Sequence, residues 1–139
     1  MSILYKAKSV YLIDDDEIFQ FATKRFIEIK NLSKSIEVFA NGKRALDHIL
    51  TQKKGEDSFL PEIILLDLNM PIMDGWDFLM EMEKLDISIK QNTIIYILSS
   101  SIDDKDIARA KQISLVRDYV IKPVDEEKLN KIFLHDLPF

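Results

Sequence analysis

The sequence predicts an α/β fold, a doubly wound five-stranded parallel sheet in a single domain that spans residues 1–139. Five short apolar runs alternate with five segments whose apolar residues recur at helical spacing. Strict alternation of this kind is typical of a parallel sheet with helices on both faces. The first, third and fourth runs are nearly continuous in aliphatic residues, as expected of strands buried on both sides. Five units are too few for an eight-stranded barrel.

The expected strands lie at residues 10–13, 36–39, 63–66, 93–98 and 116–121. Between them, helical periodicity places apolar residues on one face of each segment. The first helix has a largely apolar face made of Ile18, Phe21, Ala22, Arg25, Phe26 and Ile29. The later faces consist of Ala45, Leu46, Ile49 and Leu50, of Phe78, Leu79 and Met82, of Ile107 and Ala110, and of Leu129, Ile132 and Phe133. Asp125 is expected to be the N-cap of the last helix.

Composition excludes several classes of function. The chain has 139 residues, of which 47% are hydrophobic and 31% charged, as in ordinary globular proteins. The net charge of -5 does not favour direct binding to nucleic acid. The absence of cysteine excludes disulfides, cysteine catalysis and thiolate metal sites. No apolar run approaches the roughly 20 residues of a membrane-spanning helix, so we expect no membrane insertion and a cytoplasmic location.

Polar residues follow four of the expected strands at their carboxyl ends. Asp14 and Asp15 follow the first strand, Asp67 the third, Ser99 the fourth and Lys122 the fifth. In doubly wound sheets, ligands bind beyond these ends, where the order of the strands reverses. Adjacent first and third strands would therefore bring three carboxylates together.

Three carboxylates in one pocket repel one another, and a hard divalent cation removes that conflict. Oxygen ligands without histidine or cysteine favour Mg²⁺, which often binds phosphate as well. Ser99 adds a hydroxyl, and Lys122 adds a mobile cation. Together these groups predict a site at which a carboxylate attacks the phosphorus of a phosphoryl group.

With these residues in order, the chain resembles the receiver domain of two-component response regulators, in the manner of the stand-alone chemotaxis regulators, over nearly its whole length. The resemblance implies a flavodoxin-like (βα)5 sheet with strand order 2-1-3-4-5. It implies that Asp67 is the phosphoacceptor and that Mg²⁺ is the cofactor. Asp15 would bind the metal directly, Asp14 largely through water, and Asn69 through its backbone carbonyl.

The same resemblance gives roles to Ser99 and Lys122, which would contact the phosphoryl group, and to Tyr119, which would act with Ser99 as a switch. The expected donor is a sensor histidine kinase or a phosphotransfer protein. Phosphorylation would change the face formed by the fourth helix, the fifth strand and the fifth helix. That face would bind an unidentified downstream protein, or a second copy in a weak homodimer. The chain would catalyse its own phosphorylation and dephosphorylation rather than turn over a substrate.

Several nearby residues have simpler interpretations. Asp16 and Glu17 are expected to stabilise the start of a helix, as is the Asp74–Gly75 pair. Ser100 is the alternative to Ser99 as the serine that contacts the phosphoryl group. Beyond these, the side chains of Asn69 and Ser101 can modulate attack by water on the phosphoryl group, and His48 and His135 are expected on helix surfaces. In one departure from the family pattern, Leu115 replaces a glycine, so a left-handed turn there would be strained.

Three alternatives remain open from the sequence. A phosphatase of the haloacid dehalogenase type also uses an aspartyl nucleophile, but it has a second aspartate where this chain has Asn69. A flavodoxin-like nucleotide binder would need a glycine- or hydroxyl-rich loop after the first strand, where this chain has carboxylates. A receiver-like docking module that is never phosphorylated is the third alternative. The sequence also leaves open whether the chain is complete or part of a longer regulator.

Overall fold

The computed structural model describes residues 7–52, 61–70, 72–85 and 87–134. Its strands are β1 (Ala7–Ile13), β2 (Ser33–Phe39), β3 (Ile63–Leu66), β4 (Ile94–Ser99) and β5 (Val116–Ile121). All pairs are parallel, in the order β2-β1-β3-β4-β5, which confirms the predicted fold class and strand order. Strands β3 and β5 have the predicted bounds. Strands β1 and β2 each begin three residues earlier than predicted, and β4 lies one residue later.

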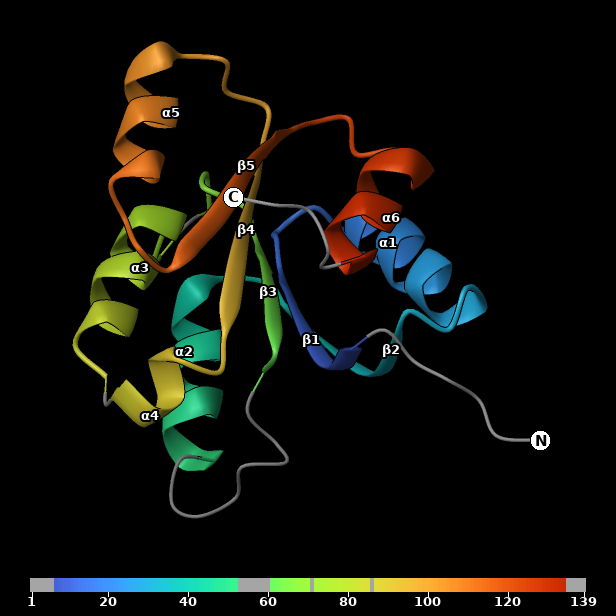
Figure 1. Ribbon diagram of the computed structural model, residues 1–139, viewed down its shortest axis with the longest axis horizontal. Coiled ribbons are helices and arrows are strands. Elements are labelled where there is room, and N and C mark those ends of the chain that lie inside the picture. Colours follow the sequence, from blue (N-terminus) through green and yellow to red (C-terminus); the bar gives the residue numbers. More distant parts are fainter. Residues whose placement is uncertain (1–6, 53–60, 71, 86, 135–139) are drawn as a thin grey trace.

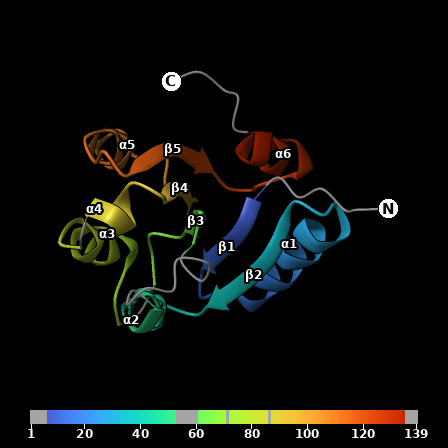
Figure 2. The same ribbon diagram turned by 60° about the horizontal axis from the view of Figure 1, so that its bottom comes forward.

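The helices are α1 (Glu17–Ile29), α2 (Gly42–Gln52), α3 (Gly75–Glu83), α4 (Ile87–Lys90), α5 (Asp104–Lys111) and α6 (Glu126–Leu134). Helices α1 and α6 cover one face of the sheet, and α2, α3 and α5 cover the other (Figures 1 and 2). The single-turn helix α4 was not predicted. None of the helices in the described ranges is both long and apolar enough to cross a membrane.

Two hydrophobic cores hold these layers together, one on each face of the sheet. Tyr11 and Ile13 of β1 face the core under α2, α3 and α5, whereas Val10 and Leu12 face the core under α1 and α6. Strands β3 and β4 alternate in the same way. Because side chains of a strand point to opposite faces in turn, a strand covered on both sides must be apolar at every position. This explains the nearly continuous aliphatic runs.

Aspartates begin four of the helices. The carboxylates of Asp16, Asp74 and Asp103 accept hydrogen bonds from backbone N–H groups in the first turns of α1, α3 and α5. Asp125 accepts one from the N–H of Lys128 in α6, at 2.9 Å. Such caps satisfy donors that have no partner within the helix, and each contributes about 1 kcal/mol. The predicted caps at Asp16, Asp74 and Asp125 are thereby confirmed.

The predicted inner face of α1 is wrong in part. Ile18, Phe21 and Ile29 are 83%, 69% and 62% exposed, whereas Thr23 and Ile27 are buried. Because α1 carries apolar residues on two stripes, periodicity alone does not tell which stripe packs on the sheet. Ile18, Phe21 and Ile29 form the outward stripe.

The strain anticipated at Leu115 is absent. Among the described residues, the non-glycine residues with positive φ are Asn31 and Ile72, and Leu115 packs against the core under α5. Ile72, with φ 73°, lies in the loop between β3 and α3. A β-branched residue pays a steric cost in this region, so the loop is held in place by contacts elsewhere.

Gly75 makes one of these contacts, because α3 begins at this residue and lies directly against the chain that follows β3. Its N–H donates to the carbonyl of Leu68 at 2.9 Å. A Cβ on Gly75 would lie 2.6 Å from the backbone oxygen of Asp67 and 2.8 Å from the Cα of Leu68. These are backbone atoms, so a side chain here would push the start of α3 away from Asp67.

We therefore predict that Gly75→Ala lowers the free energy of unfolding by about 1–3 kcal/mol through overpacking. Gly42→Ala is the matched control, since Gly42 also begins a helix. Its added Cβ would meet the Cβ of Phe78 at 3.1 Å and the Cγ and backbone oxygen of Met73 at 3.2 Å. These distances are longer than the 2.6–2.9 Å at Gly75, so shifts of a few tenths of an ångström would relieve them. Urea denaturation of both variants measures the difference. Equal losses at the two positions would contradict this account of Gly75.

Candidate functional site

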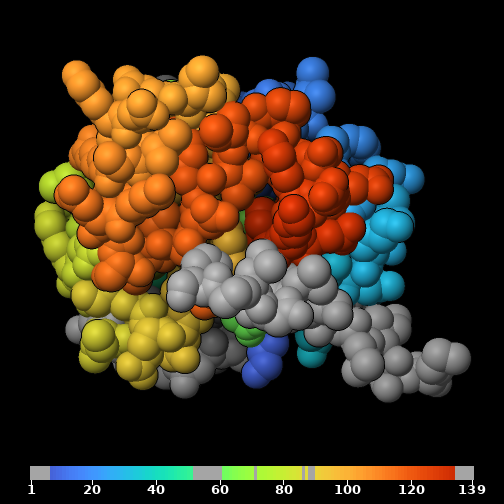
Figure 3. Space-filling model, turned by 45° about the horizontal axis from the view of Figure 1, so that its top comes forward, coloured from blue at the N-terminus to red at the C-terminus, as the bar shows by residue number. Residues whose placement is uncertain are grey.

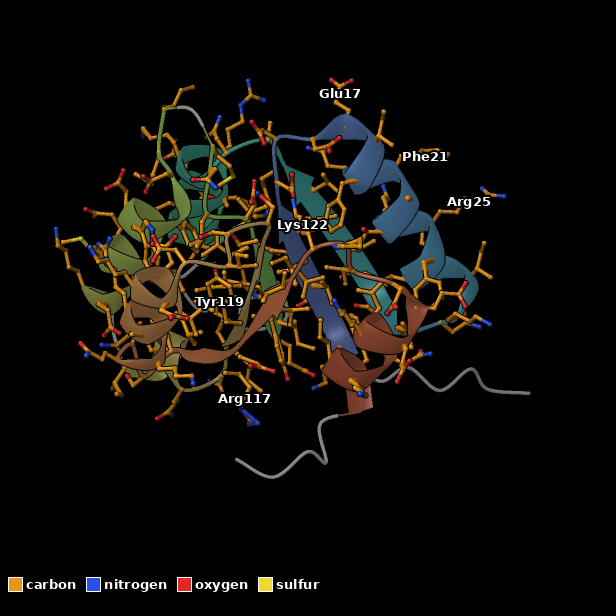
Figure 4. The ribbon with its side chains drawn as sticks, turned by 90° about the horizontal axis from the view of Figure 1, so that it is seen from above. Glu17, Phe21, Arg25, Arg117, Tyr119 and Lys122 are labelled. Carbon is orange, nitrogen blue, oxygen red and sulfur yellow. The ribbon has the colours of Figure 1, made fainter. Side chains whose placement is uncertain are left out.

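The carboxyl ends of β1, β3, β4 and β5 meet at one edge of the sheet, which Figure 4 shows from above. The backbone hydrogen bonds between neighbouring strands continue into the residues that directly follow the strands. Asp14 donates its N–H to the carbonyl of Phe39 at 3.0 Å, and Asp67 donates its N–H to that of Ile13 at 2.9 Å. Lys122 donates its N–H to the carbonyl of Ser99 at 2.8 Å. The backbone of each of these residues is therefore held by the neighbouring strand.

Asp14, Asp15 and Asp67 form an acidic cluster. One carboxylate oxygen from each lies within 4.8 Å of the others. Asp14 and Asp67 are 1% and 7% exposed, whereas Asp15 is open to solvent. A donor set made only of oxygen suits a hard divalent cation such as Mg²⁺, and the exposed side leaves room for the water that Mg²⁺ retains. The residues present therefore fit the cofactor expected from the sequence.

Lys122 brings a positive charge to this cluster. Its Nζ lies 2.8 Å from Oδ2 of Asp14 and 3.7 Å from Oδ1 of Asp67. The Lys122 side chain is 20% exposed. A partly buried ammonium beside two buried carboxylates offsets their repulsion and supplies donors for a bound anion.

The surroundings of Asp67 disfavour its charged form. Burial, and next the negative charge of Asp14, raise the pKa of Asp67 to about 6. The Lys122 ammonium and a hydrogen bond from the Asn69 N–H act in the opposite direction, but they do not cancel the rise. Asp67 is still mainly ionised near pH 7, as a nucleophilic carboxylate must be.

Asn69 lies two residues after Asp67 with its side chain exposed. Its backbone N–H supports the Asp67 carboxylate, as described above. The expected role of its carbonyl as a metal ligand remains a prediction.

The structure separates the three serines that follow one another in the chain. Ser99 ends β4 and is fully buried, whereas Ser100 is exposed, which favours Ser99 over Ser100 as the serine of the site. The Ser99 Oγ accepts a hydrogen bond from the N–H of Ser101 at 3.1 Å, which leaves its own proton available to donate. Ser101 points elsewhere, because its Oγ donates to Oδ2 of Asp106 in α5 at 2.7 Å.

Tyr119 is joined to the same loop. Its hydroxyl donates to the backbone carbonyl of Ser101 at 2.9 Å, and its ring packs against the core under α5. Tyr119 lies within β5 and Lys122 directly follows the last residue of that strand, and Figure 4 labels both. A chain of contacts therefore runs from Ser99 through Ser101 to Tyr119.

Sequence reasoning missed three residues at this site. The ring of Phe19 lies beneath the Lys122 ammonium, the side-chain amide of Gln20 donates to the carbonyl of Asp14, and Asp106 holds Ser101. All three lie on helices, and no pattern in the sequence distinguishes them from other helix positions. Asp16 acts as the helix cap already described.

The two histidines and the tryptophan lie outside the site or outside the described residues. His48 is half-buried against the rings of Tyr11 and Phe39, so it is less exposed than expected. His135 lies outside the described residues. Trp76 is half-buried, and the guanidinium of Arg109 lies over its ring, 4.2 Å from the ring centroid.

This arrangement can hold a divalent cation and a phosphoryl group side by side, with a buried carboxylate as nucleophile. The family model described as the response regulator receiver domain matches residues 10–134. This chain belongs to that family. It is therefore a receiver domain of two-component systems. This assignment takes the place of two alternatives, the haloacid-dehalogenase phosphatase and the flavodoxin-like nucleotide binder.

Individual relatives agree with the family assignment. A two-component response regulator from Cytophaga hutchinsonii superposes with a TM-score of 0.81 at 31% identity, covering 91% of this receiver and 94% of that chain. A response regulator from Legionella pneumophila has a TM-score of 0.72 at 32% identity, covering 91% and 95%. Probable methanogenesis regulatory protein FilR2 of Methanothrix harundinacea is 31% identical over 88% of this receiver and 76% of its own length.

Other relatives are longer proteins. An uncharacterized response regulatory protein of Staphylococcus epidermidis is 30% identical over 88% of this receiver, which spans 44% of that protein's length. The same share holds for the transcriptional regulatory protein HptR of Staphylococcus aureus, at 29% identity. The shared part is therefore the receiver itself.

The raised pKa of Asp67 predicts that Asp67→Asn stabilises the folded receiver. Above pH 6 the charged Asp67 carboxylate lowers the free energy of unfolding, because this group ionises more easily in the unfolded chain. The loss of stability disappears as the pH falls from about 6 towards 3.8. In metal-free buffer at pH 7.5, the variant should gain on the order of 1–3 kcal/mol. Urea denaturation across this pH range measures it, and a gain that persists unchanged at pH 4 would contradict the prediction.

Proposed function

We propose that this receiver, in the cytoplasm, accepts a phosphoryl group on Asp67 from the phosphohistidine of a sensor histidine kinase or a phosphotransfer protein. One observation carries the proposal. The buried Asp67 carboxylate lies with Asp14 and Asp15 in a cluster whose oxygens are within 4.8 Å, and its Oδ1 is 3.7 Å from the Lys122 ammonium. The groups that we propose as nucleophile, metal ligands and cation thus lie close together at one edge of the sheet, which supports the proposal.

In the transfer, a carboxylate oxygen of Asp67 forms a bond to phosphorus as the phosphorus–nitrogen bond of the donor breaks. The electron pair of that bond leaves with the donor's imidazole. Lys122 neutralises the phosphoryl oxygens, and the Ser99 hydroxyl donates a hydrogen bond to one of them. Because most phosphoryl transfer depends on position and charge, the receiver itself supplies most of the catalysis of its own modification.

The metal would be held by Asp15 and Asp67 directly, by Asp14 largely through water, and by the carbonyl of Asn69. When bound, Mg²⁺ supplies positive charge that neutralises both the carboxylates and the phosphoryl oxygens. The contacts of Asp14 support its indirect role, since its two oxygens already accept from Lys122 and from the N–H of Asp16.

Phosphorylation would change the surface formed by α5, β5 and α6, which lie side by side in Figure 3. A phosphoryl group adds charge and acceptor oxygens at Asp67 and draws the hydroxyl of Ser99 towards it. Ser99 is joined through Ser101 to the hydroxyl of Tyr119, so a new position of Ser99 shifts the balance between two packings of this surface. A downstream protein, or a second copy in a weak dimer, would recognise the shifted packing.

The direct test is phosphorylation with acetyl phosphate and Mg²⁺. We expect the wild-type receiver to gain one phosphoryl group, seen as a mass increase, and Asp67→Asn to gain none, because the amide is not a nucleophile. Asp74→Asn is the matched control, since Asp74 caps α3 in the same loop and asparagine also caps helices. Undiminished labelling of Asp67→Asn would refute the assignment. A wild-type chain that is never labelled, by acetyl phosphate or by any kinase, would favour the docking module.

A second prediction concerns the metal itself. Mg²⁺ binds the folded acidic cluster and relieves its repulsion, so it should raise the melting temperature of the wild-type receiver in proportion to the logarithm of its concentration. Asp15→Asn should lose most of this rise, while Asp104→Asn, at the exposed start of α5, should retain it. Thermal unfolding at several Mg²⁺ concentrations measures the effect. Equal responses of the two variants would place the metal elsewhere.

A further inference from the structure

The Lys122 ammonium has a neighbour that is neither an acid nor a metal ligand. Its Nζ lies 4.4 Å from the ring centroid of Phe19, on the first turn of α1. Phe19 is half-buried, and it packs against the core under α1 and α6. The face of an aromatic ring attracts a cation placed over it, and the attraction is stronger when water is partly excluded, as it is around Lys122.

The start of α1 fixes this ring in place. The carboxylate of Asp16 accepts hydrogen bonds from the N–H groups of Ile18 and Phe19, at 3.0 Å and 3.2 Å. The backbone of Phe19 is therefore tied to the acidic run that forms the site, three residues away. The ring and the ammonium meet because α1 begins at the same sheet edge where β5 ends.

The ring and the carboxylates differ in how they respond to a bound metal. Asp14 and Asp67 attract Lys122 through charge, and that attraction weakens when the same carboxylates bind a divalent cation, which also repels the ammonium. The ring of Phe19 has no net charge and no oxygen to offer a metal. Its attraction for Lys122 therefore persists when the acidic cluster is filled.

We infer that Phe19 is a positioning residue, whose ring keeps the Lys122 ammonium at the mouth of the site while the acidic cluster holds a metal. Lys122 then remains within reach of the phosphoryl oxygens at Asp67. This inference rests on the proposed function, because it assigns Phe19 a part in the binding of the phosphoryl group. Phe19 itself touches neither the metal nor the phosphoryl group.

The test measures the affinity of the receiver for beryllofluoride, a phosphoryl mimic, at a fixed saturating concentration of Mg²⁺. Phe19→Leu keeps an apolar side chain but removes the ring, so it should weaken binding about two- to fivefold. Phe19→Trp keeps an aromatic face and should restore the affinity. Phe26→Leu is the matched control, because Phe26 is a half-buried phenylalanine of α1 that packs against the same core; its affinity should match the wild type.

A background that lacks the cation separates positioning from packing. In Lys122→Met, the cation–π contact is already absent, so adding Phe19→Leu should cause no further loss of affinity. A further loss of the same size would show that the ring acts only through packing, and would overturn the inference. Phe19→Met provides the same comparison if the leucine variant does not fold.

The outcomes also distinguish this inference from the function on which it rests. If the wild-type receiver does not bind beryllofluoride, the proposed function fails. If the wild type binds and Phe19→Leu binds equally well, the inference alone is overturned and the function stands.

Discussion

The repulsion among the three carboxylates of the acidic cluster is the constraint on which the rest of this structure depends. Asp14 and Asp67 are almost fully withdrawn from water, and the negative charge of Asp14 adds to the effect of burial in raising the pKa of Asp67. The Lys122 ammonium compensates only partly, as the raised pKa of Asp67 indicates. Carboxylates whose negative charge is only partly compensated suit a divalent cation, which is what the proposed function requires of them.

The sheet holds the charges together against this repulsion. Asp14, Asp67 and Lys122 each follow a strand directly, and each donates its backbone N–H to the last residue of the adjacent strand. The backbones of these residues therefore cannot move apart without breaking hydrogen bonds between neighbouring strands of the sheet. The energy that keeps the site assembled comes from the two hydrophobic cores rather than from attractions within the site, which is the usual relation between a rigid scaffold and a strained functional site.

Prediction from sequence succeeded where the physics is local and failed where two packings compete. The apolar runs of β3 and β5 and the polar residues that follow the strands could be read directly, because strand ends and parallel topology place them at one edge. The inner face of α1 could not be chosen, since the helix carries two apolar stripes and the outward one includes Phe21. The contact between Phe19 and Lys122 could not be predicted either. It depends on where α1 lies relative to β5, which no periodicity within the helix specifies.

The contact between Trp76 and Arg109 has a practical consequence. Trp76 is the single tryptophan of the chain, and it lies on α3, whose first residue approaches the backbone of Asp67. Arg109 lies on α5, which packs beside β5 and Tyr119. Indole emission depends on the charge above the ring, so a movement of α5 relative to α3 alters the colour and brightness of the fluorescence. Trp76 is thus a natural optical probe of the contact between α3 and α5, and the response that we propose can be sought in real time without a label.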